Sequence, residues 1–148
     1  MLHRLISTYL FVGYLPKAPG TWGSLLSLPL IWFLYKLGFS YYLGFYLILF
    51  PLAVWASYKT ALELNNPDPD EVVIDEVLGM MTVYFFVPPS PLNMVLGFIL
   101  FRLIDITKPF PIKVFEKIPY GVGIIVDDIL AGVYTGLILL LLNQFLTK

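Results

Sequence analysis

The chain contains 148 residues, of which 59% are hydrophobic and 13% are charged, with no cysteine, a single histidine and a net charge of −1 at pH 7. Soluble domains carry about 25% charged residues, so this composition and a mean hydropathy of +0.84 predict one domain, residues 1–148, embedded in lipid. The lack of cysteine excludes disulfides and thiolate chemistry. The single histidine, His3, excludes a mechanism in which a phosphohistidine is partnered by a second histidine. The near-zero net charge gives no reason to expect nucleic acid as a partner.

Along the chain, residues 2–13 mix apolar side chains with His3, Arg4 and Ser7, and we expect an interfacial helix there. Apolar runs bounded by charged residues, glycine or proline then predict transmembrane helices. There are five such runs, at residues 23–37, 41–62, 72–87, 91–107 and 124–146. The expected fold is all-α: a small polytopic membrane bundle of about five transmembrane helices preceded by an interfacial helix.

The charged residues predict how this bundle sits in the membrane. With a cytoplasmic N-terminus, most basic residues fall on the cytoplasmic side, as the positive-inside rule requires; these are Arg4, Lys17, Lys59, Arg102, Lys108, Lys113 and Lys117. Only Lys36 and Lys148 fall on the other side, and every acidic residue lies on or next to the cytoplasmic side. We therefore expect a multi-pass protein of the cytoplasmic (inner) membrane with its acidic face toward the cytoplasm.

Some of these acidic residues have a simple explanation, because carboxylates at helix ends are solvated and favour the helix dipole; they are Glu63, Asp68, Asp70, Glu71 and Glu116. The others stand at the ends of apolar helices, where charge is costly and suggests function. Neighbouring carboxylates cannot all stay ionised without a cation between them, and oxygen-rich clusters suit hard divalent cations such as Mg²⁺. The candidate metal ligands and catalytic residues are Asp75, Glu76, Asp105, Asp127 and Asp128.

Small residues predict that two of these helices pack closely. Asp128, Gly132 and Gly136 recur every four residues on one helix face, and Gly79 follows the Asp75–Glu76 pair by one turn. Such a spacing allows a neighbouring backbone to approach closely.

Basic residues near the same ends predict a phosphate site. Arg102, Asp105 and Lys108 share a helical stripe, and guanidinium and ammonium groups bind phosphate oxygens. The alternative is that they are snorkelling side chains with an intrahelical ion pair. In the loop at residues 16–24, Lys17, Thr21 and Ser24 are further phosphate-binding candidates, because free N–H groups at a helix start bind anions; the alternative is an ordinary helix cap by Thr21.

Four stretches together resemble the phosphatidylglycerophosphatase A family: GYLPKAPGTWGS at 13–24, DPDEVVIDEVLG at 68–79, FRLIDITKPFPI at 101–112 and GVGIIVDDILAG at 121–132. The resemblance implies an all-α integral membrane enzyme. It also implies a Mg²⁺-dependent lipid phosphatase that converts phosphatidylglycerophosphate to phosphatidylglycerol and phosphate. The family motif positions fall on Asp75, Glu76, Arg102, Asp105, Lys108, Asp127, Asp128, Thr21 and Ser24.

Within this reading, we expect a metal-activated water to attack phosphorus. Direct attack by an aspartate, giving an aspartyl-phosphate, is the less favoured alternative. A small membrane transporter for a cation or phosphate is the alternative from another functional class, because acids within membranes also mark ion pathways. The sequence defines no oligomeric state.

Overall fold

In the computed structural model, residues 1–115, 118 and 121–146 are described, and within these ranges the chain forms helices and no strand. The predicted all-α fold is confirmed. Glu116, Lys117 and Lys148, which the charge argument includes, lie outside the described residues.

Four of the five predicted apolar runs fall within longer helices, whereas the run at 72–87 is helical only over residues 74–83. Two short elements, α1 (Leu2–Ser7) and the 3₁₀ helix η1 (Val12–Tyr14), come first, and a short α6 (Ile112–Phe115) precedes the last helix. The longer helices are α2 (Pro19–Leu37), α3 (Phe39–Leu64), α4 (Ile74–Val83), α5 (Pro91–Thr107) and α7 (Gly121–Leu146).

The prediction of about five transmembrane helices is not confirmed. Among the described residues, only α3 and α7 are long and apolar enough to cross a membrane. The run at 72–87 forms α4, a ten-residue helix that rises about 15 Å, half of the ~30 Å hydrocarbon core. Because α4 is buried on nearly all sides by the bundle, its apolar sequence reflects packing against protein rather than a membrane span.

The predicted interfacial helix is also shorter than residues 2–13. It ends at Ser7 because the chain turns through three left-handed residues, Tyr9, Leu10 and Phe11. The Ser7 and Thr60 hydroxyls share a hydrogen bond of 2.8 Å, which ties α1 to α3. Leu10 and Phe11 remain exposed beside this contact.

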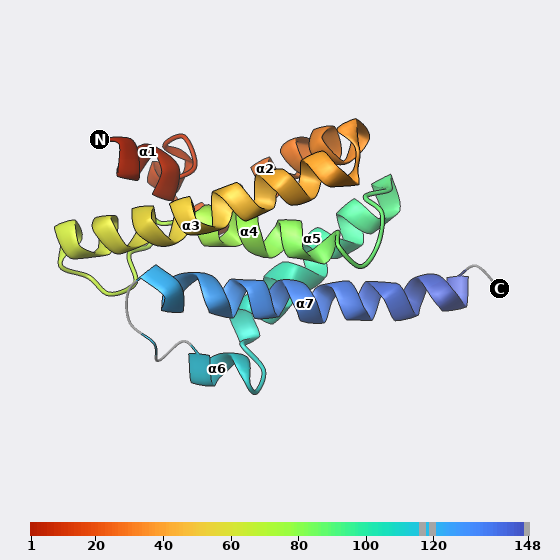
Figure 1. Ribbon diagram of the computed structural model, residues 1–148. Helices are drawn as coiled ribbons and strands as arrows, with labels where there is room; N and C mark the ends of the chain where they lie inside the picture. The colour runs from red at the N-terminus through yellow and green to blue at the C-terminus, as the bar shows by residue number, and fades with distance from the viewer. Residues whose placement is uncertain (116–117, 119–120, 147–148) are drawn as a thin grey trace.

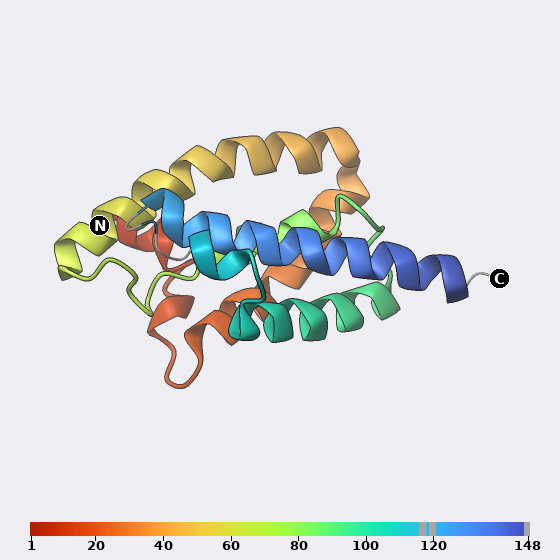
Figure 2. The same ribbon diagram turned by 90° about the horizontal axis from the view of Figure 1, so that it is seen from below.

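The long helices run lengthwise through the molecule, with α4 at the centre (Figure 1). The α2–α3 and α4–α5 connections lie at one end, whereas α4 and α7 begin toward the other (Figures 1 and 2). The most extensive helix contact joins α4 to α7. The two acid-bearing helix starts therefore lie at the same end of the bundle.

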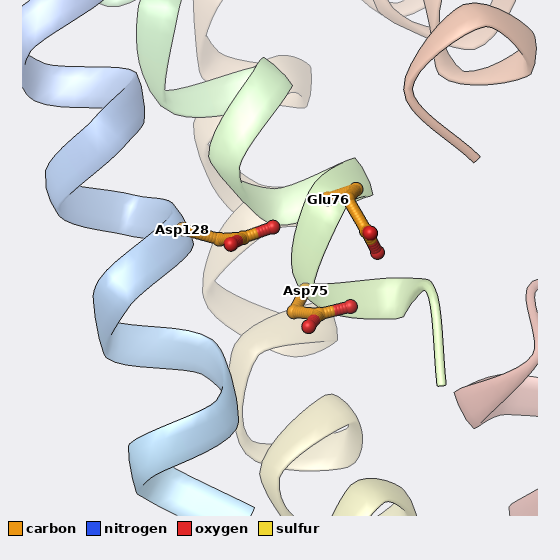
Figure 3. Close-up of side chains that lie close together, drawn as sticks. All are labelled: Asp75, Glu76 and Asp128. Atoms are coloured by element: carbon orange, nitrogen blue, oxygen red, sulfur yellow. The ribbon is translucent and has the colours of Figure 1, made fainter. Parts of the chain in front are cut away.

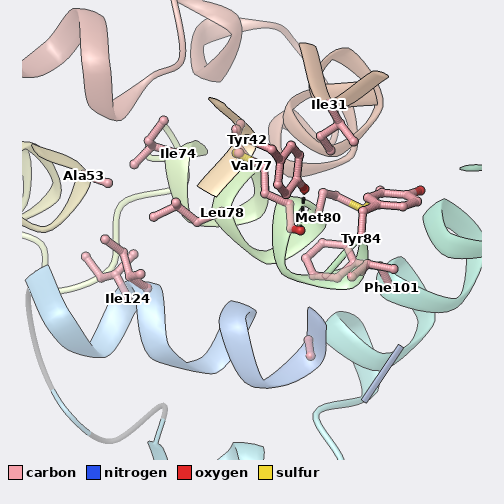
Figure 4. Packing of buried hydrophobic residues seen from close by; sticks show 14 of the residues in the cluster. Ile31, Tyr42, Ala53, Ile74, Val77, Leu78, Met80, Tyr84, Phe101 and Ile124 are labelled. Atoms are coloured by element: carbon pink, nitrogen blue, oxygen red, sulfur yellow. Dashed lines mark hydrogen bonds between the residues drawn. The ribbon is translucent and has the colours of Figure 1, made fainter. Parts of the chain in front are cut away.

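Large apolar side chains fill the space around α4 (Figure 4). Tyr42 of α3 is fully buried there and donates a 2.6 Å hydrogen bond to the carbonyl oxygen of Met81. Phe101 of α5 packs against the helix from another direction, in contact with the Gly79 position. This core holds α4 rigidly between its neighbours, and with it the acidic pair at its start.

Candidate active site

The crossing of α4 and α7 brings their acidic residues together. A Cβ atom at Gly132 would overlap with the carbonyl oxygen of Gly79, and a Cβ at Gly79 would lie 2.7 Å from the carbonyl oxygen of Asp128. The backbones therefore touch where the glycine spacing predicts close packing, and this prediction is confirmed. The contact lies one helical turn from Asp75 and Asp128 on their respective helices.

At this crossing, the carboxylates of Asp75, Glu76 and Asp128 lie with one oxygen each within 4.8 Å of the others (Figure 3). Asp75 and Asp128 are only 8% and 4% exposed. Each of the three side chains keeps one buried oxygen that has no hydrogen-bond partner within the described part of the chain. We call these three residues the carboxylate cluster.

Electrostatics make this cluster unstable without a cation or a proton. Burial raises the pKa of Asp75 well above its ordinary value, and the neighbouring carboxylates of Glu76 and Asp128 raise it further. A divalent cation would remove this repulsion and satisfy the unpartnered oxygens. The donor set, three hard oxygen ligands from two rigid helices, fits Mg²⁺.

The cluster opens into a polar cavity of about 320 Å³. Its lining comes from the start of α2, the loop before α4, the end of α5 and the start of α7. The lining residues include all the predicted acids together with Arg102 and Lys108: Ala18, Pro19, Gly20, Asp68, Pro69, Asp70, Val72, Asp75, Glu76, Arg102, Asp105, Ile106, Lys108, Ile124, Asp127 and Asp128.

Arg102 joins the cluster to α5. Its Nη1 donates a 2.7 Å hydrogen bond to Asp105 Oδ2 and lies 3.7 Å from Glu76 Oε1. The Arg102 Nε is buried without a partner among the described residues. The intrahelical pair of the alternative interpretation thus exists, and both of its residues line the cavity.

Lys108 reaches across to α7 instead of following the stripe of α5. It ends α5 in a left-handed conformation, with φ of 41°. Its Nζ donates a 2.8 Å hydrogen bond to Asp127 Oδ2. A guanidinium and an ammonium group therefore lie beside the carboxylate cluster, as a site for a phosphate group requires.

The remaining predicted phosphate-binding residues do not line the cavity. Lys17 precedes α2, and Thr21 is the third residue of that helix rather than its cap, a position that Ala18 takes. Ser24 is fully buried, and its hydroxyl donates to the carbonyl oxygen of Gly20. From residues 16–24, the cavity lining instead includes Ala18, Pro19 and Gly20.

Gly20 has a specific steric role in this site. A Cβ atom there would collide with the Glu76 carboxylate and lie 3.3 Å from Arg102 Nη1. Asp68 and Asp70, which the sequence assigns to a solvated loop, also line the cavity. The sequence does not predict that these two residues line the cavity, because the fold of the loop before α4 determines where their side chains point.

An α-helical protein with a carboxylate cluster and two cationic side chains around one cavity has the attributes of a phosphatase. Comparison with known proteins identifies the family: residues 5–143 match the family described as phosphatidylglycerophosphatase A. The chain belongs to this family and is accordingly an enzyme, a phosphoric monoester hydrolase. Membership in this phosphatase family argues against the alternative of a small membrane transporter for a cation or phosphate.

Individual relatives agree with this assignment. The chain is 36% identical to phosphatidylglycerophosphatase A of Haemophilus influenzae, over 90% of this chain and 84% of the relative. It is 33% identical to phosphatidylglycerophosphatase A of Escherichia coli, over 86% and 75%. A Bacteroides thetaiotaomicron protein, provisionally named phosphatidylinositol-3-phosphatase, is 36% identical over 88% and 87%. No solved structure matches the chain.

Proposed function

We propose that this enzyme hydrolyses phosphatidylglycerophosphate to phosphatidylglycerol and inorganic phosphate, with Mg²⁺ as cofactor. The observation that carries the proposal is the meeting of the carboxylate cluster with Arg102 and Lys108 in one cavity. The named activity of the Haemophilus and Escherichia relatives supports the choice of substrate.

Asp75, Glu76 and Asp128 are the residues that would hold Mg²⁺, because each offers a buried oxygen that has no hydrogen-bond partner among the residues that the structure describes. When bound there, the cation supplies Lewis-acid stabilisation of the phosphate and a water of lowered pKa. Arg102 and Lys108 neutralise charge on the equatorial phosphate oxygens, and a carboxylate of the site accepts the proton of the attacking water. The glycerol oxygen of the product leaves as an alcohol after it takes up a proton.

The surface of the bundle supports a location in the membrane. Only 17% of the most apolar window of α3 is buried inside the protein. Large apolar side chains such as Ile48 of α3, Ile106 of α5 and Phe145 of α7 are exposed by 66%, 70% and 76%. Contact with lipid stabilises such a surface, whereas contact with water does not. We place α3 and α7 across the cytoplasmic membrane, with the cavity at its cytoplasmic face.

The test is a phosphate-release assay on purified enzyme in detergent with three lipids: phosphatidylglycerophosphate, phosphatidic acid and phosphatidylinositol 3-phosphate. We expect the fastest release from phosphatidylglycerophosphate, loss of release in EDTA and recovery when Mg²⁺ is added in excess. A preference for phosphatidylinositol 3-phosphate would replace the proposed substrate. Undiminished release in EDTA would overturn the metal assignment.

The choice between water attack and aspartate attack needs a separate experiment. Enzyme mixed with substrate labelled with ³²P and quenched in acid within one turnover should carry no covalent label. Label retained on the protein and released by hydroxylamine would show an aspartyl-phosphate, and with it the alternative mechanism.

A further inference from the structure

The five predicted acids are not equivalent in the cavity. Asp75, Glu76 and Asp128 each keep one oxygen without a partner among the described residues. Asp127 differs, because Oδ2 accepts from Lys108 Nζ at 2.8 Å and Oδ1 accepts from the backbone N–H of Asp128 at 3.1 Å. Both of its oxygens are already engaged, and its side chain is only 7% exposed.

Asp105 accepts a hydrogen bond from a cationic side chain through one of its two oxygens. Its Oδ2 accepts the 2.7 Å hydrogen bond from Arg102 Nη1. Asp105 lies outside the set of three residues whose oxygens approach within 4.8 Å of one another. Asp127 and Asp105 each accept a hydrogen bond from a cationic side chain. Asp75, Glu76 and Asp128 instead lie together, with Glu76 also 3.7 Å from Arg102 Nη1.

We propose that Asp127 and Asp105 are positioning residues for the phosphate-binding cations rather than metal ligands. Asp127 orients Lys108, and Asp105 orients Arg102. This division of roles rests on the function proposed above and refines the expectation that all five acids bind metal.

Physical reasoning supports such a division. Lysine and arginine side chains are long and flexible, so holding them in one conformation costs entropy that a buried partner offsets before substrate arrives. Asp127 and Lys108 come from different helices, and their pair therefore also fixes the end of α5 against the start of α7. An oxygen that already accepts from an ammonium group is a poor ligand for a second cation, because the two cations repel each other.

The geometry leaves the held cations able to bind phosphate. Arg102 Nη1 is bound to Asp105, yet its Nε remains without a partner within the described ranges. The Lys108 ammonium group donates to Asp127 Oδ2 at 2.8 Å and lines the cavity. Each cationic side chain therefore lines the cavity while a carboxylate holds it in place.

Metal binding and phosphate binding can be measured separately, and this separates the two roles. We would titrate Mn²⁺ into wild-type, Asp127→Asn, Asp105→Asn and Asp128→Asn enzyme without substrate and follow free Mn²⁺ by electron paramagnetic resonance. Asp128→Asn should weaken Mn²⁺ binding by at least about tenfold, whereas Asp127→Asn and Asp105→Asn should bind Mn²⁺ as wild type does. Loss of Mn²⁺ binding in a folded Asp127→Asn or Asp105→Asn enzyme would overturn the role of that residue.

A double-mutant cycle tests whether Asp127 acts through Lys108. Asp127→Asn and Lys108→Gln should each raise KM and weaken inhibition by inorganic phosphate. The double variant should be no worse than Lys108→Gln alone, because Asp127 has nothing left to orient. Independent, multiplicative losses in the double variant would contradict the proposal, as would a failure of Asp127→Glu to recover part of the lost phosphate affinity.

These readouts also separate this proposal from the proposed function. If the wild-type enzyme prefers another phospholipid, that lipid replaces phosphatidylglycerophosphate in the cycle, and the Mn²⁺ titration stays the same. If Asp127→Asn lowers the melting temperature so far that little folded protein remains, the double variant Asp127→Asn/Lys108→Gln takes its place in the Mn²⁺ titration, because it removes both charges of the buried pair. Intact metal binding supports the proposal and lost metal binding contradicts it.

Discussion

Gly132 on α7 lies directly against Gly79 on α4, so closely that a single added carbon at position 132 would overlap with the Gly79 carbonyl oxygen. The same two helices carry the carboxylate cluster, one turn before this contact. The distance between the carboxylates therefore depends on Gly79 and Gly132, which have no side chain that could take part in the reaction.

We predict that Gly132→Ala lowers phosphate release by about 100-fold, because a shift of about 1 Å at a catalytic centre has an effect of this size. The added Cβ must push α7 away from α4 and so separate Asp128 from Asp75. Gly44→Ala is the matched control, since a Cβ at Gly44 would meet no atom of the described residues within 4 Å. Wild-type turnover by Gly132→Ala would show that the helix contact does not set the geometry of the site.

Variants of the cluster should lose activity while keeping their fold. We expect Asp75→Asn and Glu76→Gln each to lower phosphate release by at least about 10–100-fold, the range seen when metal-site partners are removed. Glu71→Gln, in the loop before α4 but outside the cavity lining, should retain activity. Near-native turnover by both cluster variants would rule out a metal site at these residues.

Asp75→Asn should not lower the thermal stability of the protein, although it should lower activity. In metal-free protein, Asp75→Asn should melt at a temperature no lower than wild type, because the amide removes one of three buried, mutually repelling carboxylates. Thermal unfolding in EDTA measures this directly. A large drop in melting temperature would mean that Asp75 supports the fold rather than a ligand.

The hydrogen bond from Tyr42 to Met81 should contribute to stability alone. Tyr42→Phe removes a fully buried 2.6 Å hydrogen bond between α3 and α4, and we expect a loss of about 1 kcal/mol in the free energy of unfolding. Tyr41→Phe is the control, because Tyr41 is 67% exposed. Denaturation of both variants in the same detergent gives the difference, and equal stabilities would contradict the prediction.

The predicted orientation can be tested cleanly because the chain contains no cysteine. Ser40→Cys, at the end of the bundle that carries the α2–α3 connection, should react with a membrane-impermeant maleimide in intact cells. Lys113→Cys, shortly after the cavity residue Lys108, should react only after the membrane is permeabilised. The reverse pattern would place the cavity on the outer face.

Local sequence determined much of this protein. Apolar runs ended by glycine, proline or charge predict helices, and each predicted run contains or lies in one, although the run at 72–87 is helical only over residues 74–83. The four-residue spacing of Asp128, Gly132 and Gly136 indicates a close helix contact, because residues four apart share one face. The confinement of the acids to one end is likewise readable without coordinates, since it follows from where the runs begin and end.

Tertiary structure alone decided which acids share a cluster. Asp127 and Asp128 are neighbours in the sequence, yet successive residues on a helix point about 100° apart. One therefore meets Lys108 and the other meets α4, and this outcome depends on how α5 and α4 pack around α7. The environment of α4 also depends on tertiary structure. An apolar run has the same composition whether lipid or protein surrounds it, so only the packing of its neighbours shows whether the run contacts lipid or lies inside the protein.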